Sequence, residues 1–240
     1  TLNKKTAMWH LKIYPFLFVL LLVMNTVIAQ QYSFKIISTQ KEYRQSVKKQ
    51  AGNRMIELKA QIPNLVYELH YATTDNFMHR RMYPAGTRNT FLRQPAVAAL
   101  QKIQAILNQQ GLGLKIFDAY RPFAVTEKFW ELIKDERYVA NPASGSNHNR
   151  GTAVDLTIIH LQTGRELPMG TGFDNFTDTA HHSFTQLPEA VLKNRNYLKS
   201  LMEQNGFKAL NTEWWHYTYQ APFPYDVLNI PFKQLVKAIH

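Results

Sequence analysis

The alternation of helical and strand-like patterns after residue 55 restricts the fold more than any other feature of this sequence. Helical periodicity of apolar residues covers Pro95 to Gly111, Val125 to Lys134 and Pro188 to Asn205. Short apolar runs typical of strands cover Leu114 to Tyr120, Ala153 to Ile159 and Trp214 to Tyr219. In the second helix, Phe129, Leu132 and Ile133 are predicted to face inward. The order predicts an α+β fold: a single domain with a small, mostly antiparallel sheet packed by helices.

The absence of cysteine limits the chemistry of the chain. No Cys occurs in the 240 residues, so disulfides, thiolate catalysis and a lipidated cysteine are excluded. Any metal must therefore be held by His and carboxylates. The length suits one catalytic domain.

The N-terminal segment has the pattern of an export signal. Lys4, Lys5 and Lys12 precede an apolar run from Ile13 to Met24, and Val27-x-Ala29 suits cleavage before Gln30. We expect a signal peptide over residues 1–29, export to the periplasm, and no membrane span after cleavage; an uncleaved anchor is the alternative. Residues 30–54 carry six Lys or Arg against one acid and are predicted to be a basic, mobile tether. The catalytic domain is predicted over 55–240.

The chain is strongly basic. Its formal net charge is +11, and removal of the leader takes away three lysines and no acid, which leaves +8. This charge is compatible with nucleic acid, with anionic wall polymers or with a membrane surface. No Arg-rich recognition helix or aromatic RNA platform is visible, so we expect no nucleic-acid partner.

A first polar segment joins a loop to a strand. His148 lies in the loop from Ser144 to Arg150, and Asp155 lies on the following strand with Val154 and Leu156 on either side. A carboxylate between such neighbours is desolvated, which a cation would offset. The alternative is that Asp155 caps a turn and that His148 is a solvated loop residue.

A second segment, Glu213-Trp-Trp-His216, places a possible base and a possible metal ligand among large aromatic residues. Burial would raise the pKa of Glu213 into the range of a general base. On an ideal strand, residues 213 and 216 face opposite sides, so Glu213 must lie on a bend at the strand entry or the motif must be a helical turn. An aromatic core strand with an incidental His is the alternative.

Together the two segments offer two imidazoles and a carboxylate as ligands, and a further Glu that need not bind the metal. Three protein ligands with an open position are typical of a hydrolytic zinc site.

These motifs resemble those of the D-alanyl-D-alanine dipeptidases of the VanX type, a family of zinc peptidases. The family patterns Ser-x-His-x6-Asp and Glu-x-Trp-His are met by Ser146, His148, Asp155 and by Glu213, Trp215, His216. Further similar stretches are Tyr71 to Phe77, Asp118 to Pro122, Met169 to Asp174 and His181-His182. The similarity spans roughly residues 65–219, and it implies the fold of the zinc D-Ala-D-Ala peptidases.

The resemblance also implies a role for each of these residues. His148, Asp155 and His216 would bind one Zn2+ per chain, Glu213 would act as general base and then acid, and Arg121 would stabilise the transition state. Asp174, Ser146 and Tyr71 would contact the substrate. Arg121 could instead be only the salt-bridge partner of Asp118, and we expect a structural role for His181 and His182.

We therefore expect hydrolysis of the free dipeptide D-Ala-D-Ala in cell-wall peptide metabolism. Two alternatives stay open: a D,D-carboxypeptidase that trims longer wall peptides, and a non-catalytic wall-binding module. The sequence leaves the oligomeric state undetermined.

Overall fold

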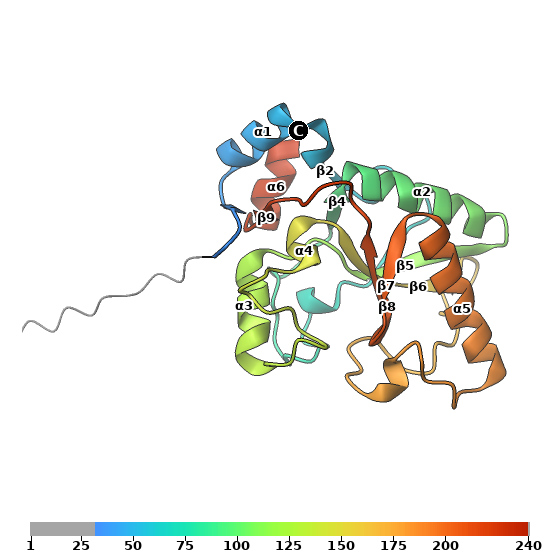
Figure 1. Cartoon of the computed structure of the whole chain (residues 1–240). Coiled ribbons are helices and arrows are strands. Elements are labelled where there is room, and N and C mark those ends of the chain that lie inside the picture. Colours follow the sequence, from blue (N-terminus) through green and yellow to red (C-terminus); the bar gives the residue numbers. More distant parts are fainter. Residues whose placement is uncertain (1–31, 240) are drawn as a thin grey trace, which may run out of the picture. The chain divides into compact units, whose positions relative to one another are not determined.

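The computed structural model describes residues 32–239 of the chain, with the side chain of Ile239 left out (Figure 1). The predicted signal peptide and its cleavage site lie outside the described residues. None of the helices that residues 32–239 form is long and apolar enough to cross a membrane.

A five-stranded sheet forms the centre of this unit (Figure 1). The strand order is β3-β5-β6-β8-β7; β3 pairs parallel with β5 and the other neighbours are antiparallel. The strands are β3 (Val66–Tyr67), β5 (Leu112–Asp118), β6 (Ala153–His160), β7 (Phe207–Leu210) and β8 (Glu213–Tyr219). The prediction of a small, mostly antiparallel sheet in an α+β domain is confirmed.

One face of this sheet is covered by two long helices, α2 (Gln94–Asn108) and α5 (Glu189–Gln204). Pro95 lies in the first turn of α2, where its missing N–H costs nothing. Val154, Leu156 and Ile158 of β6 point to this face and join the main hydrophobic core with residues of both helices. Alternation along β6 therefore sends Asp155 to the opposite face.

The opposite face is covered by shorter elements. They are α3 (Phe123–Leu132), α4 (Asn147–Arg150) and the 3-10 helix η2 (His70–Ala72). A further 3-10 helix, η3 (Asp178–Ala180), contributes Ala180 to the main core instead. A second hydrophobic cluster forms on this side around Tyr71, Tyr120 and Phe129. The predicted inward position of Phe129 is confirmed, but Leu132 is 57% exposed, because α3 ends there and its last turn projects beyond the core.

The remaining elements lie at one end of the unit (Figure 1). Two small sheets pair β1 with β9 in parallel and β2 with β4 antiparallel. Their strands are β1 (Ile36–Ile37), β9 (Val227–Leu228), β2 (Met55–Glu57) and β4 (Phe91–Arg93), and the helices are α1 (Gln40–Lys49), η1 (Ala51–Asn53) and α6 (Phe232–Ile239).

The prediction of a mobile tether over residues 30–54 is wrong for its described part. Thr39 and Glu42 form a capping box that starts α1, and Tyr43 is buried against the second cluster. The Tyr43 hydroxyl accepts a hydrogen bond from the Met55 amide at 2.8 Å. The folded unit thus begins at Tyr32, well before the predicted start at residue 55.

Candidate metal centre and active site

Three polar residues line up across neighbouring strands on the face opposite the main core. Asp118 of β5 pairs with Asp155 of β6, and Asp155 pairs with His216 of β8. Directly opposed residues in antiparallel strands project to the same side. The His216 ring therefore meets the Asp155 carboxylate, with Nδ1 2.9 Å from Oδ1.

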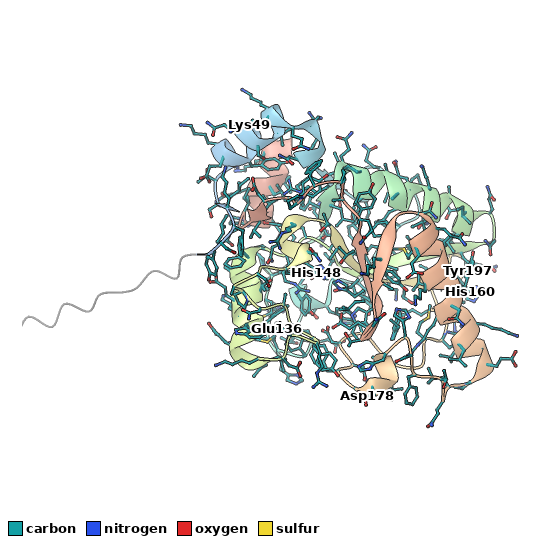
Figure 2. The ribbon with its side chains drawn as sticks, viewed as in Figure 1. Lys49, Glu136, His148, His160, Asp178 and Tyr197 are labelled. Carbon is teal, nitrogen blue, oxygen red and sulfur yellow. The ribbon has the colours of Figure 1, made fainter. Side chains whose placement is uncertain are left out.

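The short helix α4 brings His148 to the same place. Ser146 starts this helix with a capping box, its Oγ accepting from the His148 amide at 3.1 Å, and Gly151 ends it at a φ of 70°. His148 is buried, and Figure 2 shows it in the interior of the unit. Its Nε2 lies 3.3 Å from Nδ1 of His216 and 3.3 Å from Oδ2 of Asp155.

These separations fit a metal site. The three donor atoms all lie within 4.8 Å of one another. Tetrahedral zinc with bonds of about 2.0 to 2.1 Å would separate its ligand atoms by roughly 3.3 Å, which matches the two distances from His148. The predicted ligands His148, Asp155 and His216 are thus brought together, and their donor types suit zinc.

Neighbouring groups fix the orientation of both rings. Nδ1 of His148 lies 2.7 Å from the carbonyl oxygen of Ala119, which can only accept. Nδ1 is therefore protonated, and Nε2 presents a lone pair to the other donors. Nε2 of His216 lies 3.3 Å from Oγ1 of Thr218. Such outer contacts hold a ligand ring in the tautomer that a metal needs.

The Asp155 carboxylate is held in its ionised form. Burial would raise its pKa, but the charges and hydrogen bonds of His148 and His216 lower it below the usual range. An ionised carboxylate and two imidazoles are what a divalent cation requires of its ligands.

Glu213 lies next to these three residues but is not one of the three possible metal ligands. Leu210 of β7 pairs with Glu213, whereas Ala209 pairs with Tyr217, so the ladder of β8 is irregular between these positions. This irregularity is the predicted bend, and it lets Glu213 and His216 line the same pocket. Oε2 of Glu213 lies 3.8 Å from Nδ1 of His216. Within residues 32–239 its carboxylate accepts no hydrogen bond, and burial, with the charges of Asp155 and Asp174, raises its pKa well above the usual value.

Arg121 is held rigidly at the edge of the metal-binding residues. Its Nε and Nη2 lie 3.0 and 2.8 Å from Oδ2 of the buried Asp118, and Nη2 lies 3.8 Å from Oδ2 of Asp155. The guanidinium also lies over the rings of Tyr71 and Phe129. The salt bridge with Asp118 that we considered as an alternative is present, and Arg121 lines the pocket as well.

Asp174 and Tyr71 form the far wall of the pocket. The Tyr71 hydroxyl donates to Oδ1 of Asp174 at 3.0 Å, while Oδ2 is buried and has no partner among the described residues. Asp174 has a φ of 57°, an uncommon conformation for a residue with a side chain. Burial raises its pKa well above the usual value, and the charge of Asp155 adds to this effect. A carboxylate in this state is stabilised by a cation.

The predicted site residues all line one pocket of about 380 Å³. They are His148, Asp155, His216, Glu213, Arg121, Ser146, Asp174 and Tyr71. The Ser146 hydroxyl caps α4, and none of the described residues accepts a hydrogen bond from it. His181 and His182 lie outside this lining.

Two supporting groups were not predicted, and a third, Asp118, was considered only as a salt-bridge partner of Arg121. Asp118 anchors Arg121 and accepts from the Tyr83 hydroxyl at 2.7 Å, the Ala119 carbonyl orients His148, and Thr218 orients His216. An acid at the end of an apolar strand, beside Phe117 and Ala119, was the one available signal.

Comparison with known proteins agrees with this geometry. Residues 51–233 match the peptidase family described as D-Ala-D-Ala dipeptidase. The D-alanyl-D-alanine dipeptidase of Escherichia coli K12 is 36% identical over 174 residues, which cover 72% of this chain and 89% of that protein. The dipeptidase of the same description from Enterococcus faecium is 31% identical over 186 residues, 70% of this chain and 92% of that protein.

Among solved structures, a vancomycin-resistance D,D-pentapeptidase in complex with Zn(II) has a TM-score of 0.36 and 16% identity, covering 58% of this chain and 83% of that chain. This likeness is too weak to add to the assignment. The family match covers most of the chain and includes every residue of the pocket described above, so the chain belongs to the D-Ala-D-Ala dipeptidase family of peptidases.

Proposed function

We propose that this protein hydrolyses the free dipeptide D-Ala-D-Ala to two D-alanines, with one Zn2+ per chain held by His148, Asp155 and His216. The observation that carries the proposal is the position of Glu213, a buried carboxylate without a hydrogen bond, 3.8 Å from a ligand atom and in the same pocket. When bound, zinc supplies a Lewis acid that polarises the peptide carbonyl and acidifies water.

Glu213 is the proton carrier in this proposal. Its raised pKa brings it towards the range in which one carboxylate both takes and returns a proton. It accepts the proton of the attacking water and then delivers it to the nitrogen of the leaving D-alanine as the peptide bond breaks. The carboxyl group of the other product receives the oxygen of that water, so the reaction balances with one water consumed.

Arg121 stabilises the charge that develops on the peptide oxygen. The Asp118 carboxylate fixes its guanidinium in place before the substrate arrives. A fixed hydrogen-bond donor binds the peptide oxygen more strongly as that oxygen becomes negative. It therefore lowers the activation barrier without stabilising the bound substrate to the same extent.

Asp174, Tyr71 and Ser146 bind the substrate ends. The unpaired Oδ2 of Asp174 receives the ammonium of the dipeptide, and Tyr71 keeps the carboxylate in position. The free O–H of Ser146 is available to a substrate oxygen. Burial of a carboxylate is costly without a cation, so this arrangement favours a substrate with a free amine.

The rim of the pocket supports a short substrate. Tyr138 and Phe176 come from two different loops, and their rings stack at 5.0 Å with an interplanar angle of 28°. Both residues line the pocket. A stacked aromatic pair in the lining limits the space for a longer peptide, which favours a dipeptide over a longer wall peptide.

The test is a turnover assay on purified, zinc-loaded protein with D-Ala-D-Ala, with release of free D-alanine measured. The Glu213→Gln variant, which keeps the size of the side chain, is the matched control. Zinc-dependent release by the wild type and its loss in the variant would support the proposal. Absence of release by zinc-loaded wild type would reject the dipeptidase and leave the D,D-carboxypeptidase and the non-catalytic module.

The predicted export to the periplasm remains a proposal. It depends on the leader pattern, and mass spectrometry of the protein from its native cells tests it. We expect a mature N-terminus at Gln30, whereas an intact leader would contradict export with cleavage.

A further inference from the structure

Helices α1 and α6 pack side by side at one end of the folded unit (Figure 1). Gln40 donates to the Gln234 carbonyl at 2.9 Å, and Arg44 donates to the Lys237 carbonyl at 3.3 Å. Tyr43 of α1 and Leu235 of α6 are buried in the second hydrophobic cluster. The pair is therefore a fixed part of the unit, and its outer side is a stable surface.

That outer side is cationic. Lys41, Arg44 and Lys48 follow one another at spacings of three and four residues, so they form one stripe along α1. At 3.6 residues per turn, this stripe lies opposite the buried Tyr43 and Ser46. We call the exposed basic residues of the two helices the basic face; they are Lys41, Arg44, Lys48, Lys49, Lys233 and Lys237.

The charge of the basic face is not neutralised within the protein. Glu42 is the only acid between Tyr32 and Arg54, and its carboxylate is engaged with Thr39 and the Ser38 amide. Residues 229–238 contain no acid. Within the described part of the chain, no lysine of the basic face forms an ion pair with an acidic side chain.

The basic face is separate from the catalytic pocket. No residue of α1 or α6 is among those that line the pocket. Figure 2 shows Lys49 at the upper extremity of the unit, and the pocket residues His148 and Glu136 nearer its centre. Helix α1 also precedes residue 51, where the match to the dipeptidase family begins. Its charge therefore does not serve the hydrolytic reaction.

We propose that the basic face docks the protein on a bilayer that contains anionic phospholipids. Five of its six residues are lysines, which are mobile point charges without the planar fork that recognises individual phosphates. They are spread over the exposed sides of two helices, and this suits the diffuse negative charge of a bilayer surface. No aromatic side chain lies in the α1 stripe to stack on bases, which argues against single-stranded nucleic acid. Docking there leaves the pocket uncovered.

Vesicle sedimentation of the full chain tests this proposal. The probes are vesicles of phosphatidylcholine alone and of phosphatidylcholine mixed with phosphatidylglycerol, over a range of salt concentrations. The test variant carries Lys41→Gln, Lys48→Gln and Lys49→Gln. The control variant carries Lys102→Gln, Lys128→Gln and Lys134→Gln, which removes the same charge from exposed positions elsewhere. Both keep the N-terminal segment, so any contribution of that segment is common to all.

We expect the wild type to bind the vesicles with phosphatidylglycerol more tightly than those of phosphatidylcholine alone, and to lose this difference as salt rises. The test variant should bind about 100-fold more weakly, since each of its three lost lysines adds about fivefold near an anionic surface. The control variant should bind like the wild type within about twofold. Thermal unfolding midpoints and D-Ala-D-Ala turnover should match in all three, which separates loss of docking from loss of fold or activity.

Three results would overturn the proposal. The first is that the wild type fails to bind phosphatidylglycerol vesicles. The second is that the two triple variants lose binding equally, which would show that binding depends on net charge and not on the basic face. Tighter binding to soluble polyphosphate than to vesicles would assign the basic face to an anionic polymer instead.

Discussion

The carbonyl oxygen of Ala119 accepts a hydrogen bond from Nδ1 of His148 at 2.7 Å. This single contact decides which nitrogen of the ring faces Asp155 and His216, and it does so through backbone at the end of β5. The imidazole of His148 on α4 is therefore held towards Asp155 and His216, and the protein itself positions the three side chains that could hold a metal.

Zinc content should distinguish the ligands from the base. We expect His148→Ala and His216→Ala to lose most of the metal, because two remaining donors hold zinc poorly. Glu213→Gln should retain it while turnover falls by about 10² to 10⁴-fold, the range for a lost general acid–base group. Elemental analysis of the purified variants measures this, and a zinc-free Glu213→Gln protein would show that Glu213 is a ligand.

Arg121→Lys should lower kcat by roughly 10² to 10³-fold, as when an oxyanion donor is removed. Zinc content and KM should change little. Arg137→Lys is a suitable control, because the exposed Arg137 also lines the pocket but pairs with Asp135, which does not line it. If Arg121→Lys lowered the free energy of unfolding and left kcat normal, its salt bridge with Asp118 would be its whole role.

Arg195 of α5 should act on substrate binding from a distance. Its guanidinium donates to the Met169 carbonyl at 2.6 Å and to the His181 carbonyl at 3.2 Å, the two ends of the loop that carries Asp174. Lysine cannot span both acceptors. We expect Arg195→Lys to raise KM about tenfold, since a lost hydrogen bond to a charged group costs about 1.5 kcal/mol, with kcat and zinc content preserved. Steady-state kinetics decide this, and a fall in kcat at constant KM would contradict it.

The stability of the fold should depend on His182 below neutral pH. Burial lowers the pKa of His182 to about 4, and the charges of Lys199 and Arg195 add to this. Because the folded pKa lies below the unfolded value, the contribution is complete above about pH 6.5 and is lost as pH falls towards 4. Between pH 7 and 4.5 it amounts to about 1 to 3 kcal/mol after allowance for partial exposure.

Denaturant unfolding of metal-free protein at both pH values measures this contribution. The His182→Phe variant keeps a ring in place and cannot titrate, so its free energy of unfolding should fall less than that of the wild type. Equal losses in the two proteins would rule out His182 as the titrating group.

The helices and strands of the core were predictable because each buries one periodic face. The ranges expected for α2, α3, α5, β5, β6 and β8 agree with the structure to within a few residues. The convergence of His148, Asp155 and His216 was predicted too, because a buried carboxylate near two imidazoles is desolvated at a cost that a shared cation would offset. Strand geometry predicted either a bend at Glu213 or a helical turn, and the irregular ladder of β8 shows the bend.

Other features left little trace in the sequence. Helix α1 buries only a narrow face, which consists of Tyr43, Ser46 and part of Val47. Most of its other residues are charged or polar, so its composition suggested a tether. The orientation of His148 depends on a backbone carbonyl, which every residue possesses. The salt bridge between Asp118 and Arg121 is local and was considered only as an alternative role for Arg121. The Tyr83 hydroxyl that also holds Asp118 lies 35 residues away, and composition does not reveal such a contact.

The choice between dipeptidase and carboxypeptidase depends on Asp174. Its unpaired Oδ2 is proposed to receive the ammonium of a free dipeptide, a group that longer peptides lack at this position. N-acetylation of D-Ala-D-Ala would leave the buried carboxylate without its cation, at a cost of roughly 2 to 5 kcal/mol.

The most direct test is therefore a comparison of kcat/KM for D-Ala-D-Ala and for N-acetyl-D-Ala-D-Ala with the zinc-loaded wild type. We expect the acetylated peptide to be cleaved at least about 30-fold less efficiently, because each 1.4 kcal/mol corresponds to a factor of ten. Equal or higher kcat/KM for the acetylated peptide would contradict the dipeptidase assignment and identify a carboxypeptidase with the same metal centre.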